Sequence, residues 1–336
     1  MLTVTVFIKK DCRLCEQVEA DLQTLQDRYP HKLVIINIDD DAHLQAAYVE
    51  SIPVVEVGPY QLKAPFNRQK LAITLGAAQD RKQHLESIDD DAYRDSVKRG
   101  QRVSKGDRFA HWFSNHYILV FNFLVFLYVG LPFLAPVLQR AGATAPAAVI
   151  HRVYSGLCHQ LAYRSWFLFG EQPVYPRAAA GLDNYKTFHE ATGLNEDVLL
   201  PARQFVGNDT VGYKVALCQR DVAIYGAILV FGILFSLTGR KLKPLHILIW
   251  LGIGLGPIAL DGGSQLLSMY ASAFDGPFWD NLGQVFPPRE STPLLRTLTG
   301  FLFGFTTGWF GYPLMEEAMA DTRLLLTKKF SQVGED

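Results

Sequence analysis

The chain has few sulfur-containing residues and almost no net charge, and each shortage excludes a class of protein. Its 336 residues include four cysteines and four methionines, too few cysteines for a disulfide-stabilised secreted scaffold. The formal net charge is −1, so we expect no nucleic-acid partner. Residues 1–30 lack the long uncharged stretch of a secretory signal peptide, which predicts that the N-terminal part stays in the cytoplasm.

Two of the four cysteines form a CxxC motif, Cys12 to Cys15, between the apolar run 2–8 and a segment of helical periodicity. At a helix N-terminus Cys12 would be stabilised as a thiolate, and Cys15, about one turn further on, would resolve a mixed disulfide. Together with Ile52-Pro53 before the next apolar run, this order resembles glutaredoxin-like proteins of the thioredoxin fold. The resemblance implies a cis Pro53 facing the motif and shaping a substrate groove. A zinc site or an inert cysteine pair is the alternative.

Long uncharged apolar runs, by contrast, are abundant after residue 112. Four of them, residues 117–138, 222–239, 244–260 and 294–315, have the length that crosses a bilayer. The apolar run 148–170 carries His151, Arg152, His159 and Arg164, and we expect it to be a re-entrant or buried helix. Basic residues lie before the first span, at 240–243 and after the last span. Such residues favour the cytoplasmic side of a membrane, and placing all three segments there requires an even number of spans.

The predicted fold is therefore an α/β thioredoxin-like domain followed by an all-α polytopic membrane domain with four spans and one extra helix. We expect the glutaredoxin-like domain at 1–80, a basic juxtamembrane linker at 81–112, the membrane domain at 113–318 and a tail at 319–336. The first domain and the tail would lie on the cytoplasmic side of the cell membrane, with lipid around the spans.

Three polar motifs interrupt the membrane half, and they hold most of its candidate site residues: Cys158, His159, Arg164, Cys218, Arg220, Asp221, Asp261 and Gln265. Ionisable groups at such depth are costly unless they are paired or functional, so Arg164 or Arg220 is expected to pair with Asp221 or Asp261. With Arg296 and Gly300, these motifs resemble a bacterial family of predicted membrane proteins of unknown function over about residues 113–315. That resemblance implies a shared site but no activity.

Two chemistries suit the membrane cysteines. Cys158 and Cys218 can form a dithiol/disulfide pair, with His159 as proton acceptor and Arg164 or Arg220 lowering a thiol pKa. A quinone accepting the electrons would contact Arg164, Arg220, Asp221 and Gln265. Alternatively, a metal such as zinc is held by four ligands, namely Cys158, His159, Cys218 and Asp261. Both cysteines can also be merely buried apolar groups.

The sequence thus predicts an enzyme, a membrane-bound thiol–disulfide oxidoreductase that exchanges electrons with a thiol or disulfide protein or a small-molecule thiol. In it Cys12, Cys15 and Pro53 form the soluble redox site, and Cys158, His159 and Cys218 form the membrane site. A metal-binding hydrolase or transporter, or a membrane-anchored interaction module, are the alternatives.

Overall fold

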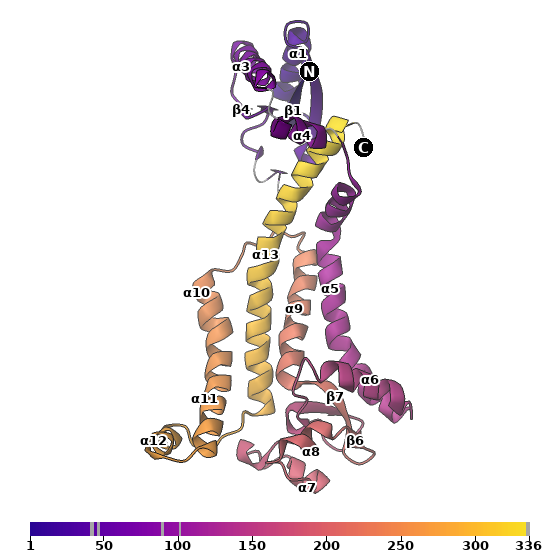
Figure 1. The fold of residues 1–336 in the computed structure, drawn as a ribbon, viewed down its shortest axis with the longest axis vertical. Helices are drawn as coiled ribbons and strands as arrows, with labels where there is room; N and C mark the ends of the chain where they lie inside the picture. Colours follow the sequence, from indigo (N-terminus) through magenta and orange to yellow (C-terminus); the bar gives the residue numbers. More distant parts are fainter. Residues whose placement is uncertain (41–43, 46–47, 89–90, 101, 334–336) are drawn as a thin grey trace. The chain divides into compact units, whose positions relative to one another are not determined.

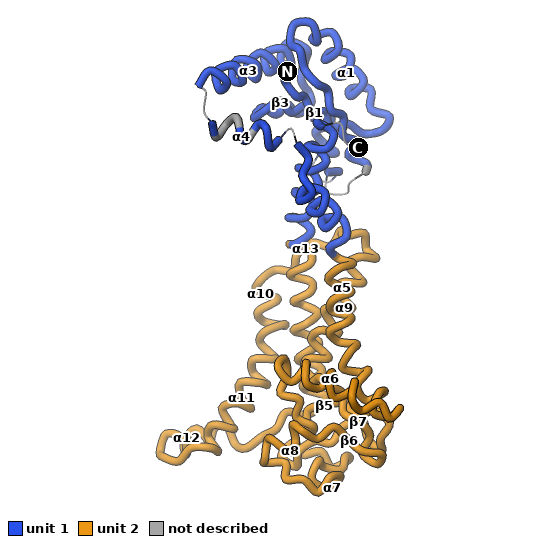
Figure 2. The backbone as a smooth tube through the Cα atoms, turned by 45° about the vertical axis from the view of Figure 1, so that its right-hand side comes forward, with its two compact units in different colours: residues 1–117, 315–336 blue, residues 118–314 orange. Residues whose placement is uncertain are grey.

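The computed structural model describes residues 1–40, 44–45, 48–88, 91–100 and 102–333, and the chain divides into two compact units (Figure 2). Unit 1 comprises residues 1–117 and 315–336, and unit 2 comprises residues 118–314. The sequence did not predict that the C-terminal residues would join the N-terminal ones in one unit.

Unit 1 is built on a four-stranded mixed sheet of order β2-β1-β3-β4. The strands are β1 (Leu2–Ile8), β2 (His31–Asn37), β3 (Val54–Val57) and β4 (Tyr60–Lys63). β1 pairs with β2 in parallel and with β3 antiparallel. Apolar residues on both faces of β1 are buried. One face packs in a cluster with residues of the two long helices of this unit, and the other packs in a cluster that includes Cys15 and Ile52, as expected of the thioredoxin-like fold.

The helices of unit 1 extend beyond the predicted domain. They are α1 (Arg13–Leu25), the 3₁₀ turn η1 (Ile38–Asp40), α3 (Arg68–Ser87) and α4 (Asp91–Gly100). The segment predicted as a linker, 81–112, is therefore largely helical, since α3 continues to Ser87 and α5 (Lys105–Arg140) already begins at Lys105.

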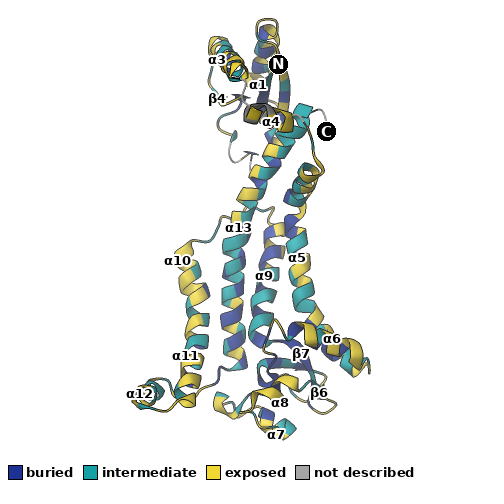
Figure 3. Cartoon of the chain, in the orientation of Figure 1, coloured by how far each residue is buried: buried dark blue, intermediate teal, exposed yellow. Residues whose placement is uncertain are grey.

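Unit 2 is a bundle of long helices with an irregular cap (Figure 1). Among the described helices, three are long and apolar enough to cross a membrane: α5, α9 (Gln219–Leu237) and the continuous helical segment Ile247–Ala273. The last combines α10 (Ile247–Ile249), a π-helical stretch η4 (Trp250–Leu255) and α11 (Gly256–Ala273). Only 11–28% of their most apolar stretches is buried, and Figure 3 shows many exposed residues along these helices. Large apolar residues such as Leu119, Phe123 and Leu248 are among them. Such a surface suits lipid rather than water.

The fourth predicted span lies within α13 (Pro293–Val333), a single helix of 41 residues. It is helical as predicted, but it is not among the three helices that meet the apolar criterion. Its glycines bring it close to α9, because a Cβ built at Gly304 would lie 2.0 Å from the carbonyl oxygen of Ile224. Gly304 therefore permits a helix contact that no other residue would allow.

The membrane half is mostly helical, as predicted, but its cap also contains strands that the sequence did not predict. A three-stranded sheet of order β5-β7-β6 lies between the first two spans. The expected helix over 148–170 is also absent, because α6 ends at Tyr154 and the chain then turns and becomes β5. The remaining elements are α6 (Thr144–Tyr154), η2 (Ala162–Arg164), β5 (Ser165–Leu168), η3 (Ala178–Ala180), α7 (Phe188–Thr192), α8 (Leu199–Gln204), β6 (Gly207–Asn208), β7 (Gly212–Cys218) and α12 (Pro277–Val285).

Candidate functional site

The CxxC motif lies at the start of α1, where the sequence predicts it. Cys12 is the N-cap residue, and the backbone N–H of Cys15 lies 3.2 Å from Cys12 Sγ. The two cysteines form a disulfide, with their Cα atoms 5.2 Å apart. Cys12 is partly exposed whereas Cys15 is buried. This arrangement leaves Cys12 open to a partner, and the N-terminal helix dipole favours its thiolate once the disulfide is reduced.

Pro53 follows a cis peptide bond, as the resemblance implies. Its neighbours Ile52 and Val54 belong to the same buried apolar cluster as Cys15 and Phe7. The cis-proline segment and the CxxC motif are thus packed against one core.

The C-terminal end of α13 reaches the same cluster within unit 1. Leu324 packs against it. The ammonium group of Lys328 donates to Glu56 Oε2 at 2.6 Å and lies 4.9 Å from the ring centroid of Phe7. Within unit 1, the apolar cluster beside the CxxC motif therefore packs against a helix from the other end of the chain.

The second cysteine pair lies in unit 2, at the end of the bundle where α5 ends and α9 begins (Figure 1). Cys158 follows α6 and is buried, and Cys218 ends β7 and is the N-cap residue of α9. The pairing of Ser165 with Cys218 brings the two segments together. The two Sγ atoms and a carboxylate oxygen of Asp221 all lie within 4.8 Å of one another. Both thiols are free.

The two thiols are not equivalent. A hydrogen bond from the Cys218 thiol lowers the pKa of Cys158, although burial acts in the opposite direction. The same hydrogen bond, followed by burial, raises the pKa of Cys218 well above its ordinary value. Cys158 is therefore the more acidic thiol of the pair, and Cys218 donates the hydrogen bond between them.

A cavity of about 270 Å³ opens beside these thiols. It gathers seven of the eight membrane-side residues singled out in the sequence, all but Asp261. The lining residues are Leu157, Cys158, His159, Gln160, Leu161, Arg164, Cys218, Arg220, Asp221, Gln265 and Arg296. His159 is exposed and lies outside the group formed by the thiols and Asp221.

Two buried carboxylates hold the arginines of the cavity in place. Asp261 forms an ion pair with Arg220, which is one of the predicted pairs, and a second with Arg289, whose Nη2 atom lies 2.9 Å from Asp261 Oδ1. Arg164, however, pairs with Glu290, its Nε and Nη2 atoms lying 2.8 and 3.0 Å from the two carboxylate oxygens. The expectation that Arg164 or Arg220 pairs with Asp221 or Asp261 is therefore met by Arg220 and Asp261, while Arg164 has a partner that the sequence did not single out.

Glu290 is the centre of this network. It also forms ion pairs with Arg296 and with Arg177, whose Nη1 atom lies 3.5 Å from Glu290 Oε2. Burial raises the pKa of Glu290, but the hydrogen bonds and charge of Arg164, then of Arg296, bring it below its ordinary value. The carboxylate thus remains ionised although only 2% of its side chain is exposed.

The sequence missed Glu290, Arg289 and Ser291, which together surround Asp261 and the arginines. Their signal was a charged run, Arg289 to Ser291, directly before the last apolar segment.

The structure changes the expected metal ligand set. Both oxygens of Asp261 are engaged by Arg220, Arg289 and Ser291, so its lone pairs are not free for a metal. Among the described residues, the ligand atoms that meet are those of Cys158, Cys218 and Asp221. Asp221 takes the place that the sequence assigned to Asp261, and His159 is not in the group.

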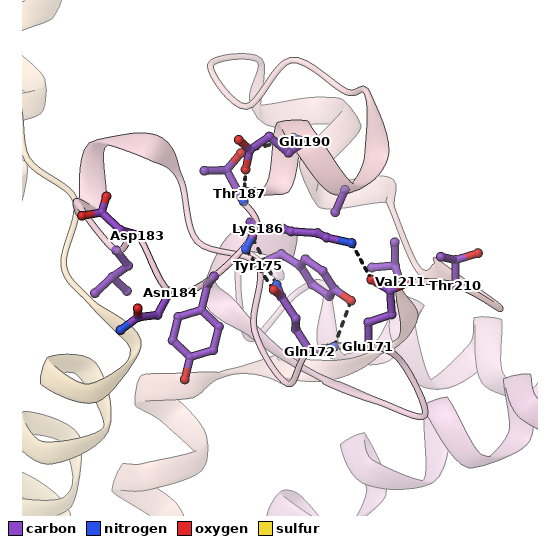
Figure 4. A pocket seen from close by; sticks show the side chains of 13 residues that line it. Glu171, Gln172, Tyr175, Asp183, Asn184, Lys186, Thr187, Glu190, Thr210 and Val211 are labelled. Atoms are coloured by element: carbon purple, nitrogen blue, oxygen red, sulfur yellow. Dashed lines mark hydrogen bonds and ion pairs between the residues drawn. The ribbon is translucent and has the colours of Figure 1, made fainter.

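A second cavity, of about 760 Å³, lies in the cap and contains none of the predicted site residues (Figure 4). Three of its charged groups have partners: Lys186 pairs with Glu171 at 2.7 Å, and Glu190 caps the helix that begins after Thr187.

Comparisons with known proteins agree with the two halves of the chain. Residues 3–76 match the glutaredoxin-like domain (DUF836), and residues 201–310 match a family described as predicted membrane protein (DUF2085). Uncharacterized protein MJ1492 of Methanocaldococcus jannaschii is 27% identical over 207 residues, which is 60% of this chain and 92% of the relative. The N-terminal part is thus similar to a glutaredoxin-like domain and the C-terminal part to a predicted membrane protein domain, which confirms the resemblance read from the motifs.

Proposed function

We propose that the chain is a membrane-bound thiol–disulfide oxidoreductase with two redox couples, Cys12/Cys15 and Cys158/Cys218. One observation carries the proposal: the two membrane cysteines, 60 positions apart, meet within 4.8 Å at a polar cavity. Both cysteines lie in a chain that already carries a CxxC disulfide on a glutaredoxin-like fold.

At the first couple, the thiolate of reduced Cys12 attacks one sulfur of a partner disulfide and releases the other sulfur as a thiol. Cys15 then attacks Cys12 Sγ, which forms the Cys12–Cys15 disulfide and releases the second partner thiol. The partner gains the two electrons that the dithiol loses. Pro53, which has no backbone N–H, leaves a strand edge open to the partner peptide.

At the second couple, Cys158 is the attacking thiolate and Cys218 the resolving thiol. Asp221 can accept the proton of the Cys218 thiol, because its carboxylate lies within 4.8 Å of both sulfurs. This geometry favours Asp221 over His159 as the proton acceptor. The partner is a small disulfide compound or a membrane quinone. It accepts two electrons as the Cys158–Cys218 disulfide forms and leaves as two thiols or as the quinol.

Contacts within unit 1 support an even number of membrane crossings. The start of α5 contacts the C-terminal part of α13, since Tyr117 donates to Glu316 and Arg323 donates to the backbone carbonyl of Ser114. If both chain ends are on one side, the number of crossings is even, which supports α13 as a fourth span. The basic linker and tail favour the cytoplasmic side. The Cys158/Cys218 couple then faces the other side, so a carrier must connect the couples.

The test uses full-length protein in detergent and the reduction of a glutathionylated peptide. Cys12→Ser should abolish turnover, whereas Cys15→Ser should accumulate the mixed disulfide on Cys12. Cys218→Ser should retain this reaction, but its Cys158 should stay in a mixed disulfide when the protein is oxidised by a small disulfide. Full turnover in Cys12→Ser, or no difference in Cys158 between wild type and Cys218→Ser, would contradict the proposal.

A metal site is the second candidate, because Cys158, Cys218 and Asp221 offer two sulfurs and a carboxylate oxygen within reach of one ion. In that case the membrane domain would be a zinc-dependent hydrolase or a transporter. Metal analysis of protein purified without chelator separates the two. Stoichiometric zinc that is lost in Asp221→Asn favours this candidate, and a metal-free dithiol excludes it.

A further inference from the structure

The cavity beside Cys158 and Cys218 contains more hydrogen-bond donors than the protein can satisfy. Arg220 Nε and Gln265 Nε2 are buried there without a hydrogen-bond partner. The Gln265 side chain helps to lower the pKa of Glu290, but its Nε2 atom forms no hydrogen bond of ordinary distance and angle. Both atoms carry hydrogens and can only donate.

The neighbouring carboxylates are already occupied. Five guanidinium groups converge on Glu290 and Asp261: Arg164, Arg177, Arg220, Arg289 and Arg296. Each of the four carboxylate oxygens accepts at least one of them. Asp221 adds a third carboxylate, and Asp197 pairs with Arg177 as a fourth. The ion pairs themselves join the five guanidinium groups to three carboxylates, those of Glu290, Asp261 and Asp197.

The arginines approach the cavity from separate elements. Arg164 comes from η2, Arg220 from the first turn of α9, and Arg296 from the first turn of α13. Gly262 makes room for one of them, because a Cβ at that position would lie 3.1 Å from Arg220 Nη1. The result is a fixed set of donors from three helical elements around one space, with a fourth, Gln265, from α11.

We propose that this cavity binds a small anion through acceptor oxygens, held by Arg220 and Gln265 with Arg164 and Arg296 around it. The ligand is an inorganic oxyanion or the carboxylate of a small organic molecule. Guanidinium groups bind both of these with strong, charge-assisted hydrogen bonds. Binding does not depend on redox activity of the thiols. Its role as the substrate pocket of the Cys158/Cys218 couple does rest on the proposed function, and it then assigns that couple an anionic substrate.

The test is calorimetry on the full-length protein in detergent, with sulfate and malonate as probes and chloride at matched ionic strength as reference. Alkylation of Cys158 by the neutral reagent N-ethylmaleimide provides a second readout and should become slower as the site fills. Saturation by sulfate alone identifies an oxyanion site, and saturation by malonate alone identifies a carboxylate site. Absence of saturable binding by either probe overturns the proposal.

Variants locate the binding. Arg220→Gln and Gln265→Leu should each weaken it by about tenfold or more, the typical loss of a hydrogen bond to a charged group. Arg152→Gln, an exposed residue outside this cavity, should bind as wild type. Gln265→Leu leaves every ion pair intact, so it decides the test if Arg220→Gln does not fold. Equal affinity in wild type and Gln265→Leu would refute the site. Repeating the titration in Cys218→Ser separates binding from redox activity, since the anion should still bind.

Discussion

Replacing Glu290 by glutamine should destabilise unit 2 more than any single surface change. The carboxylate is 2% exposed, and it receives Arg164 through two hydrogen bonds of 2.8 and 3.0 Å as well as Arg296, which is 3% exposed. Removing its charge leaves buried guanidinium groups uncompensated. Breaking a buried pair in this way costs about 3–5 kcal/mol, which corresponds to a lowering of Tm on the order of 10 °C for a unit of this size.

The assay is thermal unfolding of the full-length protein in detergent, followed by tryptophan fluorescence. Asp209→Asn is the matched control, because Asp209 pairs with Arg140 at 3.3 Å on the surface, with 83% and 55% of their side chains exposed. That change should cost about 0–1 kcal/mol. The double variant Glu290→Gln/Arg296→Met should recover part of the loss, since it removes a stranded charge together with its partner. A Tm for Glu290→Gln within error of that for Asp209→Asn would refute the reasoning.

Three further predictions concern packing, pH and access. Gly304→Ala should lower Tm because its Cβ would meet a backbone carbonyl of α9 at 2.0 Å, whereas Gly226→Ala, with open space around it, should be neutral or stabilising in the same melt. Burial, then the charge of a neighbouring lysine, lowers the pKa of His151 to about 4 from 6.5. The unfolded chain therefore takes up this proton first, and stability should fall as the pH drops from 6.5 towards 4. Tm measured across this range should flatten in His151→Gln, and an unchanged slope would contradict the assignment. Leu324→Ala should speed reduction of the Cys12–Cys15 disulfide by a phosphine, because Leu324 packs on that cluster, whereas Leu325→Ala, 66% exposed, should not. Equal rates would show that the helix does not shield the disulfide.

Local signals predicted the glutaredoxin-like domain well. The apolar run at 2–8 is β1 with the predicted bounds. Cys12 caps α1, as expected of the first cysteine of a CxxC motif between a strand and a helix. The cis bond before Pro53 followed from the family pattern. Each of these features depends on residues that are close together in the sequence or on a motif with fixed spacing.

Local sequence signals could not predict the sheet of the cap or the partners in the ion pairs. The strands of the cap have only four, two and seven residues, and the paired residues of β5 and β7 are more than forty positions apart in the sequence. No local sequence pattern therefore predicts the sheet. Arg164 and Glu290 are 126 positions apart. Charge alone indicated that a buried arginine needs a carboxylate, and Arg220 with Asp261 was among the pairs expected. Glu290 was not singled out as a partner of Arg164, because only the fold decides which carboxylate is near.

The measurement that most directly tests the central claim is a redox titration of Cys158 and Cys218 in isolated membranes. Membranes are equilibrated with glutathione buffers of graded potential, quenched with acid and alkylated, and the peptides are analysed by mass spectrometry together with zinc content. The account predicts that both thiols are lost together over one two-electron transition, with a Cys158–Cys218 disulfide as product and no bound zinc. Thiols that remain alkylatable at every potential, or that become so only after chelation, would contradict it.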